Sequence, residues 1–176
     1  MTRDGELQLS ILKNRARALA KELCAPDDGL KALEIIEFRL AAETYGIESK
    51  HIREIYPLRD FTPIPGTPSF VLGLANVRGQ ILSVIDLKKF FNLPEKGLGE
   101  LNKIIVVSSE TMEFGILADS ITGARMVLLE NILESPPTVS GIGAEYLKGI
   151  TKERLAVLDM ETILSDTRII VDQHGR

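Results

Sequence analysis

Few residues in this chain have the types and spacing that covalent or metal chemistry needs. The two histidines, His51 and His174, lie far apart, and Cys24 is the single cysteine, so these side chains lack metal-ligand spacing. Gly141-Ile142-Gly143 begins like a dinucleotide-binding loop, but it lacks the third glycine and the surrounding βαβ pattern. Asp27-Asp28 follows a predicted helix and is typical of a helix stop. We therefore expect no enzyme activity and no metal or other cofactor.

Arg78 is the first candidate for a binding residue. It lies at the turn between two β-type runs, 71–77 and 81–85, and the adjacent Gly79 suits a hairpin turn that needs positive φ. A guanidinium placed by such a turn can hold a carboxylate in one geometry, and we name Glu54 as its partner. Local pattern alone is more typical of a solvated turn residue.

The segment Ile104-Ile105-Val106-Val107 is too apolar for a strand with one face in water. Because side chains alternate along a strand, we expect one of Ile104 and Ile105 to point inward and the other outward. An outward isoleucine would need a partner surface to cover it. In the earlier segment 51–58, we assign Ile55 to the core.

Short amphipathic runs separated by turn residues predict a mainly β protein. The predicted strands are 36–40, 45–47, 51–58, 71–77, 81–85, 104–107, 114–117, 125–129, 146–150 and 155–158, and a short helix follows at about 159–165. Leu12, Ala16, Leu19 and Leu23 form one apolar stripe, which predicts an amphipathic N-terminal helix within residues 1–30 that packs on the strands.

Three apolar phrases recur in the same order on both sides of a linker at 93–100. Residues 45–47 resemble 114–116, residues 70–74 resemble 146–150, and residues 84–87 resemble 157–160. The repeat predicts two similar lobes, about 31–92 and 101–158, within a domain 31–176. We expect each lobe to be a closed or nearly closed antiparallel barrel of about five short strands.

Bulk composition excludes several classes of protein. The formal charge of −4 argues against general nucleic-acid binding, which needs a basic face. No apolar run reaches the roughly 18–20 residues that cross a bilayer, so we expect no direct membrane insertion. The first residues lack the apolar core of a signal peptide, and one cysteine fits a reducing compartment. Together these features predict a cytoplasmic location.

The segment 61–91 resembles the hallmark of CheW-type chemotaxis coupling proteins. That hallmark is an Asn-Leu-Arg-Gly turn followed by an apolar strand ending in Val-Asp-Leu, and this chain reads Asn76-Val77-Arg78-Gly79 and then Val84-Ile85-Asp86-Leu87. Val77 stands where the family usually has leucine, and Ser83 stands where it usually has proline. The resemblance extends from about Leu33 to Leu164.

The resemblance implies two five-stranded barrels side by side around an apolar seam. It also implies a non-catalytic adaptor that couples methyl-accepting chemoreceptor tips to the regulatory domain of a CheA-type histidine kinase in receptor arrays. Carried over residue by residue, it places a partly exposed Ile52 with Glu54 and Arg78 in the receptor-binding groove, and Ile104 and Ile105 at the kinase contact.

Two alternatives stay open at this point. One is a CheW-like scaffold that serves a kinase pathway other than chemotaxis. The other is a small-molecule-binding barrel that uses the cleft between the lobes. The latter needs converging polar side chains, whereas the expected lining is Ile, Val and Leu.

Overall fold

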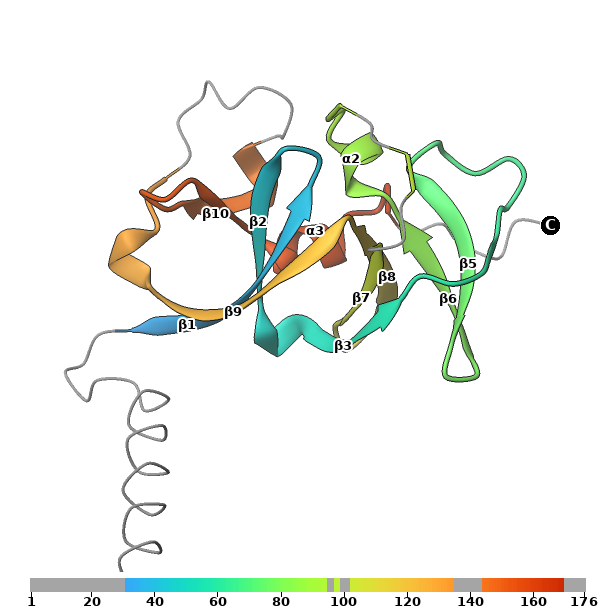
Figure 1. Cartoon of the computed structure of the whole chain (residues 1–176), viewed down its shortest axis with the longest axis horizontal. Coiled ribbons are helices and arrows are strands. Elements are labelled where there is room, and N and C mark those ends of the chain that lie inside the picture. Colours follow the sequence, from blue (N-terminus) through green and yellow to red (C-terminus); the bar gives the residue numbers. More distant parts are fainter. Residues whose placement is uncertain (1–30, 95–96, 99–101, 135–143, 170–176) are drawn as a thin grey trace, which may run out of the picture. The chain divides into compact units, whose positions relative to one another are not determined.

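Two β-sheets and few helices make up the domain in our computed structural model, which describes residues 31–94, 97–98, 102–134 and 144–169 (Figure 1). The helix predicted within residues 1–30 and the candidate motifs Asp27-Asp28 and 141–143 lie outside the described residues, as do Cys24 and His174. No helix of the described ranges is long and apolar enough to cross a membrane.

The first sheet, here called sheet A, has the strand order β10-β11-β2-β1-β9. Its strands are β1 (Ala32–Leu40), β2 (Glu43–Glu48), β9 (Ser120–Leu128), β10 (Leu147–Ile150) and β11 (Leu155–Leu158). The second, sheet B, has the order β3-β7-β8-β6-β5-β4. Its strands are β3 (Ile52–Pro57), β4 (Phe61–Thr62), β5 (Val71–Val77), β6 (Gln80–Ile85), β7 (Lys103–Ser108) and β8 (Glu113–Ala118).

Short helices connect or follow these strands. They are the 3₁₀ turns η1 (Ser49–His51), η2 (Leu129–Asn131) and η3 (Ala144–Tyr146), and the α-helices α2 (Leu87–Phe90) and α3 (Met160–Ser165). Each α-helix follows an aspartate that caps its first turn: Asp86 accepts a hydrogen bond from the backbone N of Lys88, and Asp159 accepts from Glu161 and Thr162. The predicted C-terminal helix is confirmed.

The sheets do not follow the predicted division of the chain into 31–92 and 101–158. After the β1–β2 hairpin of sheet A, β3 joins sheet B beside β7, and after the β7–β8 hairpin of sheet B, β9 joins sheet A beside β1 (Figure 1). The two sheets therefore exchange their third strands. Sequence periodicity cannot detect this exchange, because it shows which face of a strand is buried and not which strand lies beside it.

The expected closed or nearly closed antiparallel barrels are not found in the part of the chain described. β2 pairs with β11 in parallel, and so does β6 with β8. In sheet B the hydrogen-bonded order runs from β3 to β4 without closing, and a sixth, two-residue strand adds to the expected five. The mainly β character with few helices is confirmed.

The predicted internal repeat has close structural counterparts. Gly46 and Gly115 each lie opposite a valine of a parallel neighbour, Val157 and Val84. A Cβ atom on either glycine would lie 2.5 Å from the Cγ2 atom of an isoleucine on the preceding strand, so a side chain at either position would require that isoleucine to shift. The segments 45–47 and 114–116, and likewise 84–87 and 157–160, thus occupy equivalent positions in the two sheets.

Apolar side chains fill three regions. The largest cluster lies between the sheets and includes Phe38 and Tyr45 of sheet A, Ile105 and Ile116 of sheet B, and Ile163 of α3. Two smaller clusters lie on the other face of each sheet. The apolar seam expected between the lobes is therefore present.

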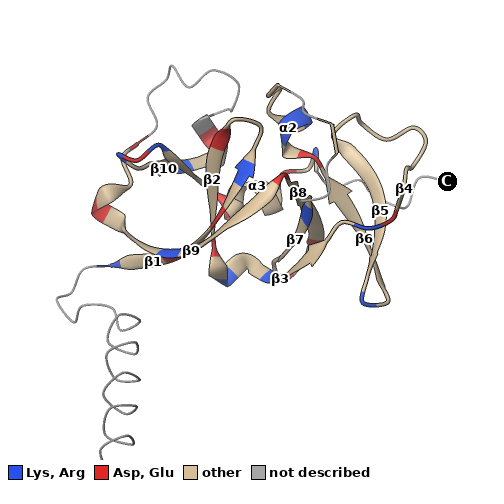
Figure 2. Cartoon of the chain, in the orientation of Figure 1, with Lys and Arg blue, Asp and Glu red and all other residues tan. Residues whose placement is uncertain are grey.

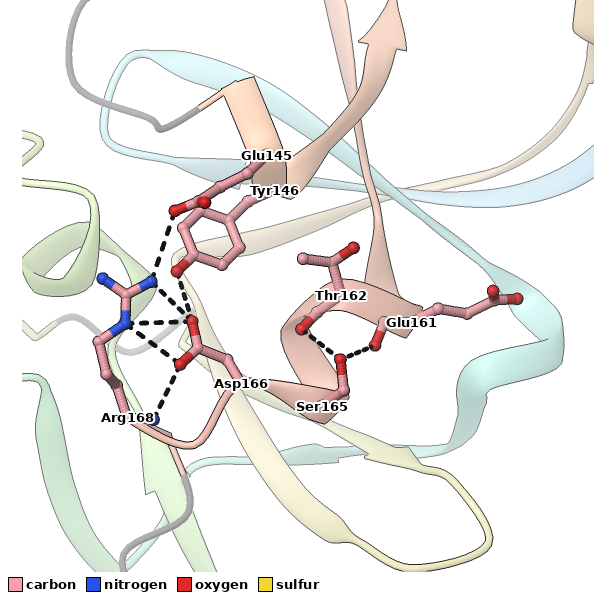
Figure 3. Close-up of polar contacts among 7 residues, drawn as sticks. All are labelled: Glu145, Tyr146, Glu161, Thr162, Ser165, Asp166 and Arg168. Atoms are coloured by element: carbon pink, nitrogen blue, oxygen red, sulfur yellow. Dashed lines mark hydrogen bonds and ion pairs between the residues drawn. The ribbon is translucent and has the colours of Figure 1, made fainter.

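The segment after α3 makes polar contacts with η3, the turn before sheet A strand β10 (Figure 3). Asp166 accepts a hydrogen bond from the Tyr146 hydroxyl of η3 and a second from Arg168 Nη2 at 2.8 Å. The Arg168 guanidinium lies 5.5 Å from the centre of the Tyr146 ring and 5.6 Å from that of Phe90 in α2. These cation–π contacts join η3, which leads into sheet A, to α2, which follows sheet B.

Candidate binding site at the Arg78 turn

The β5–β6 hairpin closes with a two-residue turn, Arg78-Gly79, between the paired residues Val77 and Gln80. Both turn residues have positive φ, 52° and 87°, which is the geometry that matches the twist of a hairpin. An arginine in this region carries a strain of about 1–2 kcal/mol. The Asn76 side chain supports the turn by accepting a hydrogen bond from the Gly79 N–H at 2.8 Å. Figure 2 shows the hairpin tip as a basic, projecting turn.

The predicted partnership of Arg78 and Glu54 is confirmed as a contact. Arg78 Nε donates to Glu54 Oε2 at 2.6 Å, and the side chains are 73% and 18% exposed respectively. β3 and the β5–β6 turn are not neighbours in the strand order, so this ion pair crosses the open side of sheet B. A side-chain contact thus bridges the place where a closed barrel would have backbone hydrogen bonds.

A second polar network beside this pair was not predicted. Arg53 Nη1 donates to Gln80 Oε1 at 2.8 Å and also pairs with Glu113, at the start of β8. Gln80 Nε2 completes the triangle by donating to Glu113 Oε2 at 2.8 Å. Nothing in the spacing of these residues signals the contact, because Arg53 and Glu113 are 60 positions apart.

Apolar side chains border this polar surface. Ile52 is half-buried, as expected, and packs against the core between the sheets. Ile55 is 37% exposed, so its assignment to the core is wrong: it lies on β3, an edge strand, where neighbours cover only one side. Ile81, next to the turn, is 58% exposed.

Ile104 and Ile105 do not offer the surface that the sequence predicted. They point to opposite faces of β7, as alternation requires, but they are only 1% and 0% exposed. Ile104 packs in the cluster inside sheet B, and Ile105 packs between the sheets. The expected outward isoleucine is therefore wrong, and the burial removes the physical reason for placing a kinase contact on these side chains.

The described residues contain no group of three or more His, Cys, Asp or Glu side chains arranged to hold a metal ion. His51 is the last residue of η1, directly before β3, and its Nε2 atom is buried without a hydrogen-bond partner in the described part of the chain. Burial, with the nearby Lys50 charge, holds the pKa of His51 below its ordinary value. The lowered pKa favours the neutral form of the imidazole.

The architecture is that of a small two-sheet β domain with an exposed ionic turn. The family model described as CheW-like domain matches residues 34–168. The chain is 32% identical over 143 residues to Chemotaxis protein CheW of Treponema pallidum, covering 77% of this chain and 84% of that protein. It is 30% identical over 154 residues to Protein FrzA of Myxococcus xanthus, covering 82% and 96%.

A solved structure agrees with these matches. The crystal structure of the scaffolding protein TtCheW from Thermoanaerobacter tengcongensis superposes with a TM-score of 0.67 at 28% identity, over 78% of this chain and 90% of that one. The chain belongs to the CheW family of chemotaxis scaffold proteins.

Proposed function

We propose that this protein is a non-catalytic, cytoplasmic adaptor that links chemoreceptor tips to the regulatory domain of a CheA-type histidine kinase. Membership of the CheW family supports the adaptor role. The observation that carries the receptor side is the Arg78–Glu54 pair, since these two residues form the contact that the family resemblance led us to expect.

The geometry suits recognition of a protein segment. Arg78 projects from a strained turn with most of its guanidinium exposed, and Glu54 holds it by one nitrogen only. Ile52 and Ile81 add apolar surface close to the same sheet end. A helical receptor tip that buries its apolar side on such isoleucines and its polar side on the ionic turn is bound in the manner of a helix in a groove.

Co-sedimentation with receptor tips and kinase tests the proposal. Purified protein is expected to sediment with receptor assemblies and to bring the kinase with it, while Arg78→Ala is retained poorly and still melts within a few degrees of the parent. Arg39→Ala, an exposed arginine of sheet A, is the matched control. Failure of the parent protein to associate with receptors would refute the receptor side, and ATP hydrolysis that tracks the protein would refute the non-catalytic role.

A scaffold in a different kinase pathway is the second candidate. The similarity to Protein FrzA covers 96% of that protein. Because that relative is not named as a chemotaxis protein CheW, the similarity also allows a pathway other than chemotaxis. Pull-down from the native cell discriminates the two pathways, because the kinase and receptors recovered identify the system that the adaptor serves.

A further inference from the structure

A hollow opens on the side of sheet B where the strand order does not close. It has a volume of about 320 Å³, or that of about ten water molecules. Its walls come from β3, the connection to β4, β5, the Arg78 turn and β7. Its lining consists of Tyr56, Pro57, Arg59, Asp60, Ala75, Asn76, Arg78, Gly79 and Ile104. We call it the β3–β5 hollow. It lies near the small-ligand end of the range of binding cavities, which is about 300–1,000 Å³.

Hydrogen-bond donors without a protein acceptor converge on this hollow. Arg78 uses only Nε, toward Glu54, and Asn76 uses only its carbonyl oxygen, toward Gly79. In the described part of the chain, the Arg59 guanidinium and the Tyr56 hydroxyl make no hydrogen bond or ion pair. All four side chains present N–H or O–H groups, and two of them are guanidinium forks that match a carboxylate.

The charges around the hollow favour a singly charged anion over a doubly charged one. Arg59 and Arg78 contribute two positive charges and Asp60 one negative charge, and Glu54, which pairs with Arg78 beside the lining, adds a second negative charge. A carboxylate can bind the guanidinium nitrogens that make no other hydrogen bond, whereas a phosphate dianion would bring a second negative charge close to Asp60 and Glu54. Among the apolar residues of the lining, Pro57 is half-buried and offers a surface on which methylene groups can lie, whereas Ala75 and Ile104 are buried.

We propose that the β3–β5 hollow receives the carboxylate of a glutamate side chain from the partner segment that docks at the Arg78 turn. The guanidiniums of Arg59 and Arg78 hold the two oxygens, and Tyr56 and Asn76 supply further donors. This inference rests on the proposed function, since it gives the receptor segment an acidic anchor. It places that anchor inside sheet B, away from the apolar seam between the sheets.

The first test uses a small probe, N-acetyl-glutamate methylamide, with N-acetyl-glutamine methylamide as its neutral counterpart. In amide-resolved NMR titrations, the acidic probe is expected to shift the Asn76 and Gly79 resonances, with the neutral one at least tenfold weaker. Arg59→Gln is expected to weaken the acidic probe at least tenfold, while Arg39→Gln on sheet A leaves it unchanged. Equal binding of the two probes, or tighter binding of inorganic phosphate, would overturn the carboxylate assignment.

The second test separates this inference from the proposed function. In the co-sedimentation assay, Arg59→Gln is expected to lower receptor retention at least fivefold and Arg39→Gln to leave it unchanged. Unchanged retention of Arg59→Gln, together with probe binding that depends on Arg59, would mean that free acids and not the partner fill the hollow, which overturns the proposal. If the parent protein binds the acidic probe but no receptor, the proposed function and the partner's glutamate fail together while the carboxylate site itself stands.

Discussion

The ion pair between Lys88 and Asp119 is a mostly buried contact between distant parts of the domain. Lys88 follows β6 at the start of α2, and its side chain is only 2% exposed. Its Nζ donates to Asp119 Oδ1 and lies 3.8 Å from Asp86 Oδ1. Asp119 occupies the junction where the chain leaves β8 for β9, and its other oxygen accepts the Ala41 N–H at 2.7 Å. One carboxylate therefore connects α2, the β8–β9 junction and the β1–β2 turn.

Asp119→Asn removes the charge and keeps an oxygen for the Ala41 N–H. The buried Lys88 ammonium then lacks its main counter-charge, and breaking a buried pair in this way costs about 3–5 kcal/mol. Asp119 is 21% exposed, and Asp86 remains nearby, so we expect the lower end, about 3 kcal/mol. For a domain of this size that corresponds to a fall in melting temperature of about 6–12 °C.

Urea unfolding followed by circular dichroism measures the loss, since urea, unlike guanidinium chloride, does not screen charges. Lys152→Met, at an exposed lysine, is the control and is expected to change the unfolding free energy by less than about 0.5 kcal/mol. The double variant Lys88→Met with Asp119→Asn removes both charges and is expected to recover at least half of the loss. A loss below about 1 kcal/mol for Asp119→Asn, or a double variant equal to the sum of the singles, would refute the reasoning.

Three further predictions follow from the geometry. Arg78→Ala is expected to weaken receptor binding by about 2 kcal/mol, roughly 30-fold, with little change in melting temperature, because the Arg78 side chain is 73% exposed; a variant that unfolds, or binds as before, contradicts the role. Gly115→Ala is expected to destabilise the domain by about 1–3 kcal/mol in urea unfolding, since its Cβ would lie 2.5 Å from Ile104 Cγ2; unchanged stability would show that the isoleucine moves aside freely. The lowered pKa of His51 means that the unfolded chain binds more protons, so stability should fall as pH drops below about 6.5; the decline between pH 7.5 and 5.5 should be shallower in His51→Gln, and an identical pH profile would exclude His51 as its source.

Local sequence patterns predicted the elements and one contact of the candidate site well. The Arg78 turn follows from its glycine and its flanking β-type runs, and the contact with Glu54 is present as predicted. The C-terminal helix begins directly after Asp159, as the sequence indicated. Such features depend on a few neighbouring residues or on a motif that the family shares. Both can be recognised in a single sequence.

Features that depend on tertiary placement were missed. Ile104 and Ile105 alternate as expected, but the curvature of sheet B covers one face of β7 and sheet A covers the other. The continuous apolar run 104–107 therefore marks a strand that is buried on both faces within the domain, and not a strand with one face left for a partner protein. Ile55 was expected to be buried and is exposed. Its apolar side chain could not indicate that β3 is an edge strand.

The exchange of β3 and β9 bears on how the whole domain holds together. Neither sheet is formed by one continuous stretch of the chain. Sheet A takes its edge strand β9 from the segment that follows the β7–β8 hairpin, and in sheet B the strand β7 has β3 as one of its two neighbours. Asp119 lies at one of these crossings, where its backbone N–H donates to Arg39 O at 2.9 Å and its side chain binds Lys88. Loss of the Asp119 contacts is therefore expected to destabilise both β1 of sheet A and α2, the helix that follows sheet B. We therefore expect the two sheets to unfold together, since the contacts of both belong to one compact unit that begins at Leu33.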